Sequence, residues 1–228
     1  MAEIIPAILP QNFDELRVSL VAVRGLSSYV QIDICDGVFV PTVTWPYGDS
    51  REFLAIIGGE EGLPFWKDIQ FEIDLMVTNP EDVIDDWIDV GASRIIVHNK
   101  STDALAIILE RLEYAQIERG VALQIDEDPE GLRPHIEKLD FIQCMGIAHI
   151  GQQGEAFDER VIDLITRVSK SFPGLPISVD GGVSFKTAVA LARAGATRLV
   201  SGSAILGAKD PREAFASLQS LVAGGGSN

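Results

Sequence analysis

The sequence predicts an α/β fold, a (β/α)8 TIM barrel, because short apolar runs alternate with helical patterns along its 228 residues. The runs are rich in isoleucine and valine and bounded by turn residues, as buried parallel strands are. Eight of them fit one domain over residues 1–223, with a flexible tail over residues 224–228. A doubly wound sheet is the alternative, but it usually has fewer strands and a glycine-rich turn after the first strand. Here that turn is Leu9-Pro10-Gln11-Asn12.

The expected strands are bounded by turn residues: Glu3–Ile8, Tyr29–Ile34, Ile69–Met76, Arg94–His98, Val121–Ile125, Phe141–Met145, Ile177–Val179 and Arg198–Ser201. The expected helices lie between them: Asn12–Arg24, Asn79–Val90, Thr102–Ile117, Phe157–Phe172, Ser184–Ala194 and a last helix that begins at Asp210. Asn79 is the expected N-cap of its helix, with Pro80 at the first helical position. The longest irregular stretch is Val38–Asp68, whose aromatic residues could shape a binding site, the barrel rim or an interface: Trp45, Tyr47, Phe65 and Trp66.

Composition indicates a cytoplasmic protein. Eighteen basic and 34 acidic residues give a net charge of −16, which disfavours nucleic acid and anionic membranes as partners. We expect no signal peptide, because the N-terminus lacks a basic region, and no membrane span, because no apolar run is long enough. Cys35 and Cys144 form neither a disulfide framework nor a zinc pair and are expected to be small apolar fillers.

Acidic side chains are expected at the carboxyl ends of the strands, where such barrels carry their chemistry. Strand side chains alternate in direction, so one face of each strand can be written out. Gln31, Asp33 and Cys35 share a face of the second strand; Glu72, Asp74 and Met76 share a face of the third; and Asp180 follows the seventh. An aspartate there is often only a turn residue or an N-cap. Asp36-Gly37 already supplies the turn after Asp33, which favours a site role for Asp33.

Glycine-bearing loops follow strands six, seven and eight of the expected barrel. They contain Gly151 and Gly154, then Gly181 and Gly182, then Gly202 and Ser203. Glycines let backbone N–H groups approach a phosphate, and the last two loops are the common phosphate site of this barrel class. The alternative is that these glycines only close tight turns. His98, which ends the fourth strand, is expected to be a core or rim residue.

Several motifs, in this order and spacing, resemble the ribulose-phosphate 3-epimerase family over nearly the whole chain. They are Pro6-Ala7-Ile8-Leu9, Asp33-Ile34-Cys35-Asp36-Gly37-Val38-Phe39-Val40-Pro41, Asp74-Leu75-Met76-Val77-Thr78-Asn79-Pro80, Val179-Asp180-Gly181-Gly182-Val183 and Ser201-Gly202-Ser203-Ala204-Ile205. The resemblance implies a barrel of the ribulose-phosphate-binding type. It also implies an isomerase of the pentose phosphate pathway that interconverts ribulose 5-phosphate and xylulose 5-phosphate.

In the family, one aspartate removes a proton from the substrate carbon, which gives an enediolate, and a second aspartate returns a proton from the opposite side. A divalent metal is held by these two aspartates and two histidines. The resemblance gives the catalytic roles to Asp33 and Asp180. The two histidine positions are Gln31 and Asp74 here, and Cys35 and Ala7 replace a methionine and a serine. The loop Ile150–Glu155 keeps two of three glycines. Oxygen ligands from Gln31, Asp33, Asp74 and Asp180 would suit magnesium or manganese better than zinc.

Three outcomes stay open for this rewritten site. A cation could bind the four oxygen-bearing side chains, the enediolate could be stabilised without metal, or the epimerase chemistry could be lost. Repulsion among three carboxylates favours the cation. The functional alternatives are therefore a phosphosugar epimerase and a non-catalytic or repurposed barrel that binds a phosphosugar. A related decarboxylase is less favoured, because Cys35 stands where those enzymes have lysine. The expected partner is a small phosphorylated sugar, and a homo-oligomer is allowed.

Overall fold

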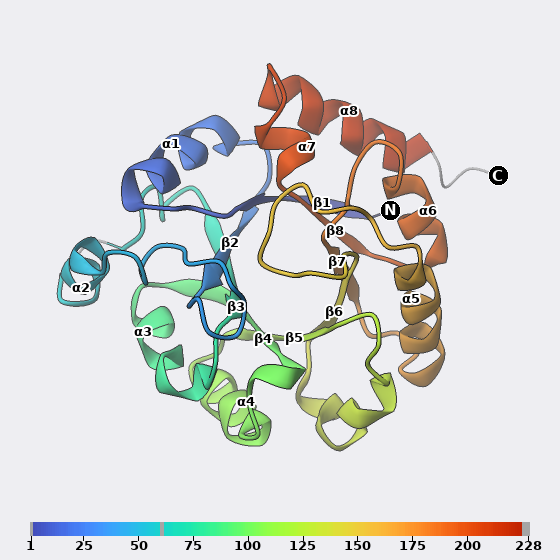
Figure 1. The fold of residues 1–228 in the computed structure, drawn as a ribbon, viewed down its shortest axis with the longest axis horizontal. Helices are drawn as coiled ribbons and strands as arrows, with labels where there is room; N and C mark the ends of the chain where they lie inside the picture. The colour runs from blue at the N-terminus through green and yellow to red at the C-terminus, as the bar shows by residue number, and fades with distance from the viewer. Residues whose placement is uncertain (1, 60–61, 225–228) are drawn as a thin grey trace.

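Eight parallel strands close into a barrel in chain order, which confirms the predicted fold (Figure 1). The structure is a computed structural model and describes residues 2–59 and 62–224. The strands are β1 (Glu3–Ile8), β2 (Tyr29–Cys35), β3 (Gln70–Met76), β4 (Ala92–His98), β5 (Glu118–Leu123), β6 (Phe141–Met145), β7 (Ile177–Asp180) and β8 (Arg198–Ser201). The predicted strand positions are confirmed to within three residues at each end.

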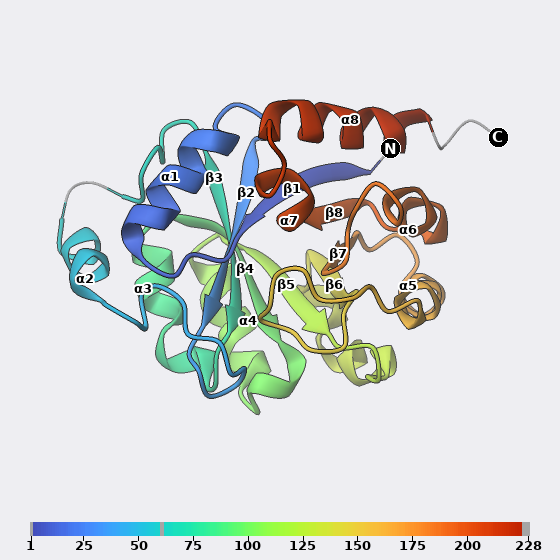
Figure 2. The same ribbon diagram turned by 45° about the horizontal axis from the view of Figure 1, so that its top comes forward.

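Helices surround the barrel (Figures 1 and 2). They are α1 (Phe13–Val23), α2 (Arg51–Ile57), α3 (Ile84–Asp89), α4 (Leu105–Tyr114), α5 (Arg160–Ser171), α6 (Ala188–Ala194), α7 (Ser203–Leu206) and α8 (Pro211–Gly224), with 3-10 turns η1 (Pro80–Asp82), η2 (Asn99–Ser101) and η3 (Pro129–Lys138). Gly224, predicted to begin the tail, ends α8, and residues 225–228 lie outside the described residues. Within the described residues, no helix is both long and apolar enough to cross a membrane.

Three local features differ from the sequence predictions. The stretch Val38–Asp68, expected to be irregular, contains a helix, α2, although turn residues surround it. Residues 129–138, for which no helix was predicted, form a 3-10 helix. Pro134 inside it lacks the N–H donor that a regular α-helix needs there. Asn79 is not an extended N-cap: its φ is 52° and its side chain makes no capping bond. Its backbone N–H instead donates to the Ser101 carbonyl, which ties this turn to the loop after β4.

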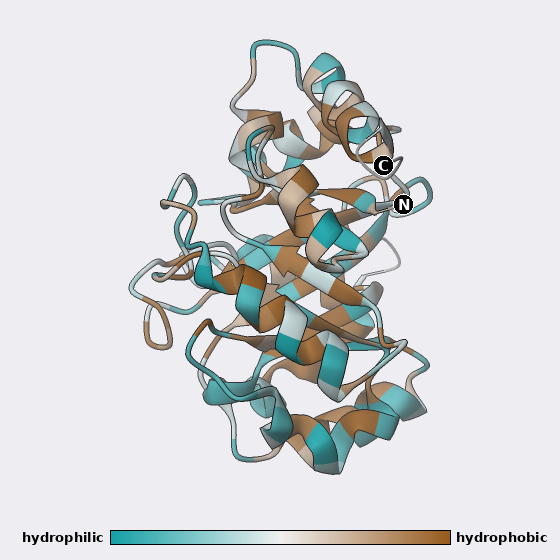
Figure 3. Ribbon diagram, turned by 90° about the vertical axis from the view of Figure 1, so that its right-hand side faces the viewer, coloured by the Kyte–Doolittle hydropathy of each residue, from teal (hydrophilic) through white to brown (hydrophobic). Residues whose placement is uncertain are grey.

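The main core lies between the outer faces of the strands and the helices. Figure 3 shows strands that are mostly hydrophobic beside helices that carry hydrophilic residues as well. Trp45 belongs to this core, because its ring packs against Phe13, Phe53 and Trp87. Burying one such side chain contributes about 2 kcal/mol. The aromatic loop is therefore partly structural, while Trp66 stays half exposed. A homo-oligomer, which the sequence allows, stays an expectation.

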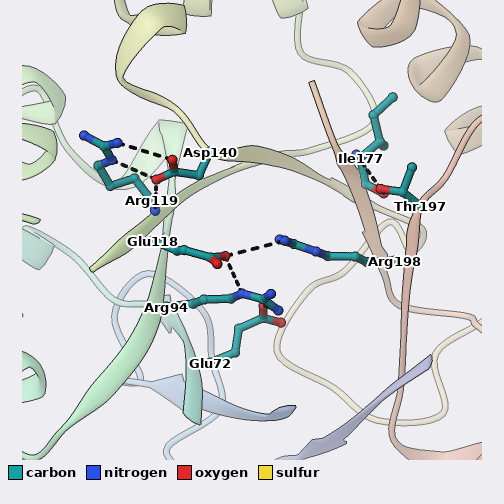
Figure 4. A network of polar contacts seen from close by, with 8 residues as sticks. All are labelled: Glu72, Arg94, Glu118, Arg119, Asp140, Ile177, Thr197 and Arg198. Carbon is teal, nitrogen blue, oxygen red and sulfur yellow. Dashed lines mark hydrogen bonds and ion pairs between the residues drawn. The ribbon is translucent and has the colours of Figure 1, made fainter. Parts of the chain in front are cut away.

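A layer of paired charges fills the barrel at the amino ends of its strands (Figure 4). Arg94 contacts Glu72 at 3.3 Å and Glu118 at 2.5 Å, and Arg198 reaches Glu118 at 3.5 Å. The Arg94 guanidinium also lies 3.4 Å from the centre of the Tyr29 ring. Opposite charges therefore compensate one another at this end of the barrel.

Candidate active site at the carboxyl ends of the strands

Strand register places two of the predicted aspartates side by side. Asp33 of β2 pairs with Asp74 of β3, and Gln31 pairs with Glu72 one step below. Residues paired in register point to the same face, so all four side chains enter the barrel. Thr44 fixes the end of β2, because its hydroxyl accepts from the Cys35 N–H at 2.8 Å and donates to the Asp33 carbonyl at 3.2 Å.

The turn after β2 is built by Asp36 and Gly37, as predicted. The Asp36 carboxylate accepts from the N–H groups of Val38 and Phe39 at 2.8 Å, and from that of Thr78 at 2.8 Å. Gly37 has a φ of +78°, and a Cβ there would overlap the Val43 side chain. Asp36 is therefore a turn residue, which leaves Asp33 free to face the barrel mouth.

Gln31 joins the two predicted catalytic aspartates. Its Nε2 donates to Asp33 Oδ1 at 2.7 Å and to Asp180 Oδ2 at 3.0 Å. The other Asp180 oxygen accepts from the Gly181 N–H at 2.7 Å. One ligand atom from each of Asp33, Asp74 and Asp180 lies within 4.8 Å of the others. Side chains from three strands therefore form one carboxylate cluster.

Burial and mutual repulsion raise the pKa of the two catalytic candidates. Burial, then the charges of Asp180 and Asp74, hold the pKa of Asp33 well above its usual range. Burial, then the Asp74 charge, raises the pKa of Asp180 to about 7. The hydrogen bonds from Gln31 act in the opposite direction and do not cancel the rise. Near neutral pH the pair can therefore hold one proton between its members.

A cavity of about 250 Å³ opens above this cluster. Asp33 and Asp180 line it. So do all the residues predicted to bind phosphate: Gly151, Gly154, Gly181, Gly182, Gly202 and Ser203. Met76 and Met145 supply apolar wall. No lysine or arginine is among the described residues that line it. An anionic group entering here would meet neutral donors on one side and carboxylates on the other.

The glycine-bearing loops interlock around the cavity. The loop after β6 arches across the barrel mouth (Figure 1). A Cβ on Gly151 would overlap Val40, and one on Gly202 would lie 2.9 Å from the Gln153 amide nitrogen. The Ser201 hydroxyl donates to the Val183 carbonyl at 3.2 Å and so joins the loops after β7 and β8. Gly181 and Gly182 have φ values of +90° and +69°, a conformation that other residues adopt only with strain.

Gly146→Ala is expected to lower stability by about 1–3 kcal/mol, the usual cost of overpacking. The added Cβ would overlap the Gly181 carbonyl oxygen, and the Gly146 N–H donates to the Asp180 carbonyl at 2.6 Å. Thermal unfolding tests this, with Gly131→Ala as the control, because a Cβ at Gly131 meets no atom within 4 Å. Equal melting temperatures for the two variants would show that the contact between β6 and β7 is not tight.

The donor set fits a hard divalent cation. Three carboxylates converge, and the Gln31 Oε1 is buried with no hydrogen-bond partner among residues 2–59 and 62–224. The amide presents its nitrogen to the carboxylates, contrary to the oxygen ligand expected from the sequence, because two carboxylates attract an N–H donor. A half-turn about the last side-chain torsion would present the unpartnered oxygen instead. Oxygen ligands of this kind suit Mg²⁺ or Mn²⁺.

Sequence comparisons identify the family of the chain. The sequence model of the ribulose-phosphate 3 epimerase family matches residues 3–206. The chain belongs to this family. It is 30% identical over 222 residues to the ribulose-phosphate 3-epimerase of Schizosaccharomyces pombe, covering 97% of this chain and 94% of that one. It is 29% identical to the cytoplasmic isoform of the ribulose-phosphate 3-epimerase of Oryza sativa, over 98% of this chain and 95% of that one. The predicted family and class of enzyme, an isomerase, are confirmed.

Solved structures share the family's fold at lower identity. KGPDC from Streptococcus mutans, solved as a ligand complex, has a TM-score of 0.74 at 14% identity and covers 97% of each chain. The 3-hexulose-6-phosphate synthase of Salmonella typhimurium has a TM-score of 0.72 at 20% identity and covers 98% of this chain and 99% of that one. These likenesses support the barrel and say nothing about the reaction of this chain.

Two side chains beside the cluster were not predicted from the sequence. His98, expected in the core or rim, places its Nε2 3.1 Å from Asp74 Oδ1. Gln143 donates to Asp74 Oδ2 at 3.1 Å. A polar residue inside the otherwise apolar strand Phe141–Met145 was the available signal for Gln143. Cys35 and Cys144 are buried free thiols, as expected.

Proposed function

We propose that this chain epimerises ribulose 5-phosphate at C3, with Asp33 and Asp180 as the acid/base pair. The observation that carries the proposal is the attachment of both carboxylates to one Gln31 nitrogen beneath a cavity rimmed by three glycine-bearing loops. The names of the relatives supply the substrate. Glycine loops would bind the phosphate, and the substrate carbon would then lie above the carboxylates.

The chemistry needs one carboxylate ionised and the other protonated. The ionised member takes the C3 proton, and the protonated member delivers its proton to the opposite face of the resulting enediolate. In the cation-free chain, burial and the neighbouring carboxylates raise the pKa of both groups, which favours this mixed state near neutral pH. Met76 and Met145 line the same cavity and limit the access of water to the carbanion. The pair ends each turnover with its roles exchanged.

A divalent cation held by Asp33, Asp74, Asp180 and the Gln31 oxygen is part of this proposal. When bound, it would neutralise the carboxylates and stabilise negative charge on the substrate oxygens. The acidic cavity itself argues for it, because no basic side chain among its described lining residues offsets the carboxylates or an incoming phosphate. Mg²⁺ and Mn²⁺ are the cations proposed.

The second candidate function is a phosphosugar-binding barrel without epimerase activity. The replacement of both family histidines by Gln31 and Asp74 favours it. It predicts that ribulose 5-phosphate raises the melting temperature without exchange of the C3 proton with solvent. Proton exchange that disappears in Asp33→Asn and Asp180→Asn would exclude this candidate.

Asp180→Asn is expected to stabilise the cation-free protein above neutral pH, although it removes a catalytic group. Asp180 has a folded pKa of about 7, above its unfolded value, so the folded chain holds a proton that the unfolded chain has released. Stability therefore falls as pH rises from about 4 to 7, and the loss is complete at about pH 8. The variant should gain up to about 4 kcal/mol over wild type at about pH 8 and little at about pH 4.

Urea unfolding of chelator-treated protein at the two pH values measures this gain. Asp103→Asn is the matched control, because Asp103 is an exposed aspartate outside the carboxylate cluster. It should not change the difference between the two pH values. A variant at Asp180 that is equally destabilised at both would contradict the raised pKa.

A further inference from the structure

Asp74 is held from two sides by nitrogen atoms of other strands. His98 of β4 places Nε2 3.1 Å from Asp74 Oδ1, and Gln143 of β6 donates from Nε2 to Asp74 Oδ2 at 3.1 Å. Asp74 and Gln143 are 0% exposed and His98 is 1% exposed. Each carboxylate oxygen therefore has its own buried partner, which fixes the rotation of the carboxylate about its last torsion.

These two contacts are the main polar contacts of both partners. His98 Nδ1 and Gln143 Oε1 are buried without a hydrogen-bond partner in the part of the chain that the structure describes. Because the carboxylate accepts, Nε2 carries the proton in the His98 tautomer that makes this bond. Leaving a buried polar atom unpaired costs about 1–3 kcal/mol. An apolar side chain would fill either position at a lower cost, so packing alone does not account for them.

We propose that His98 and Gln143 are positioning residues that turn the Asp74 carboxylate toward Asp33 and Asp180. Each oxygen of Asp74 has one lone pair engaged, by His98 or by Gln143, and its other lone pair is left for the cluster, where the three ligand atoms lie within 4.8 Å of one another. The His98 imidazole thus affects the proposed cation site indirectly, by orienting the Asp74 carboxylate. The inference rests on the proposed function, which supplies the cation site. It adds a positioning role for His98 and Gln143, which the proposed function alone does not require.

The two nitrogens reach Asp74 from different parts of the barrel, which makes the arrangement specific. β4 is the direct neighbour of β3, whereas β6 is three strands away around the barrel. The centre of the His98 ring also lies 5.5 Å from the centre of the ring of Phe39, a residue of the loop that follows β2. Side chains that orient a ligand in this way typically change metal affinity or activity by about 10–100-fold when they are removed.

Two substitutions of His98 separate positioning from packing. In His98→Gln the amide Nε2 can take the place of the imidazole Nε2, whereas in His98→Asn the amide is too short to reach Asp74. Mn²⁺ binding to chelator-treated protein is measured by calorimetry, and kcat and KM are measured for ribulose 5-phosphate. We expect His98→Asn to weaken Mn²⁺ binding by about 10–100-fold and to lower kcat more than it raises KM. His98→Gln should recover most of both.

Gln143→Leu tests the second contact and guards against a misfolded His98 variant. It removes the donor and keeps a similar volume, so it should also weaken Mn²⁺ binding by about 10-fold or more while the cation-free melting temperature stays near that of wild type. Unchanged Mn²⁺ affinity in folded His98→Asn and Gln143→Leu would overturn the inference, as would wild-type protein without saturable Mn²⁺ binding. Intact Mn²⁺ binding without any epimerisation by wild type would instead contradict only the proposed function.

Discussion

Asp33→Asn and Asp180→Asn are each expected to lower kcat for ribulose 5-phosphate by about 10³-fold. Asparagine keeps the shape of the side chain but neither accepts nor delivers the C3 proton. The Gln31 amide can still donate to an asparagine oxygen, so the cluster should keep its geometry. The phosphate loops are not touched, and the affinity for the phosphosugar should therefore stay within a few-fold of wild type.

Single-turnover assays and calorimetric titration with ribulose 5-phosphate measure the two quantities separately. Asp126→Asn serves as the control, because it removes an exposed carboxylate from a loop at the same end of the barrel. It should behave as wild type. Near-normal turnover in either Asp33→Asn or Asp180→Asn would show that another group carries the proton.

Removal of the cation is expected to lower kcat by about 10²–10³-fold, because negative charge on the enediolate then lacks its electrostatic partner. Mn²⁺ or Mg²⁺ should restore activity better than Zn²⁺ at equal free concentration, since the ligands are carboxylate and amide oxygens. Gln31→His supplies an imidazole and should shift the preference toward Zn²⁺.

Dialysis against a chelator, followed by metal analysis and addition of single cations, tests this expectation. The affinity of the cation-free protein for ribulose 5-phosphate shows whether the cavity keeps its structure without the cation. Full activity in protein that contains no cation would contradict the proposed metal site. Best activity with Zn²⁺ in the wild type would contradict an all-oxygen ligand set and indicate a nitrogen or sulfur ligand.

The barrel could be predicted from sequence because most strands coincide with a short apolar run that turn residues bound. The α2 helix could not, because glycine, proline and aromatic residues surround it and hide a single buried phenylalanine, Phe53. Period-two alternation placed Gln31, Asp33 and Asp74 on inward faces, and the register of β2 and β3 bears this out. Short-range patterns were enough there because neighbouring strands follow each other in the chain.

The contacts of Asp74 depend instead on how the barrel closes. Gln143 reaches it from a strand that is distant both in sequence and around the barrel. A lone histidine such as His98 at a strand end has no pattern that separates a ligand partner from a core residue. The orientation of the Gln31 amide is likewise set by carboxylates from two strands, Asp33 and Asp180. Such contacts become visible only in three dimensions.

Solvent deuterium incorporation tests the central claim most directly. Wild-type protein of known metal content is incubated with ribulose 5-phosphate in D₂O, and the substrate and product pools are followed by NMR. We predict deuterium at C3 together with formation of xylulose 5-phosphate, both dependent on Asp33, Asp180 and a bound divalent cation. Ribulose 5-phosphate that binds, yet keeps its C3 proton in cation-loaded protein, would contradict the account and identify a binding barrel.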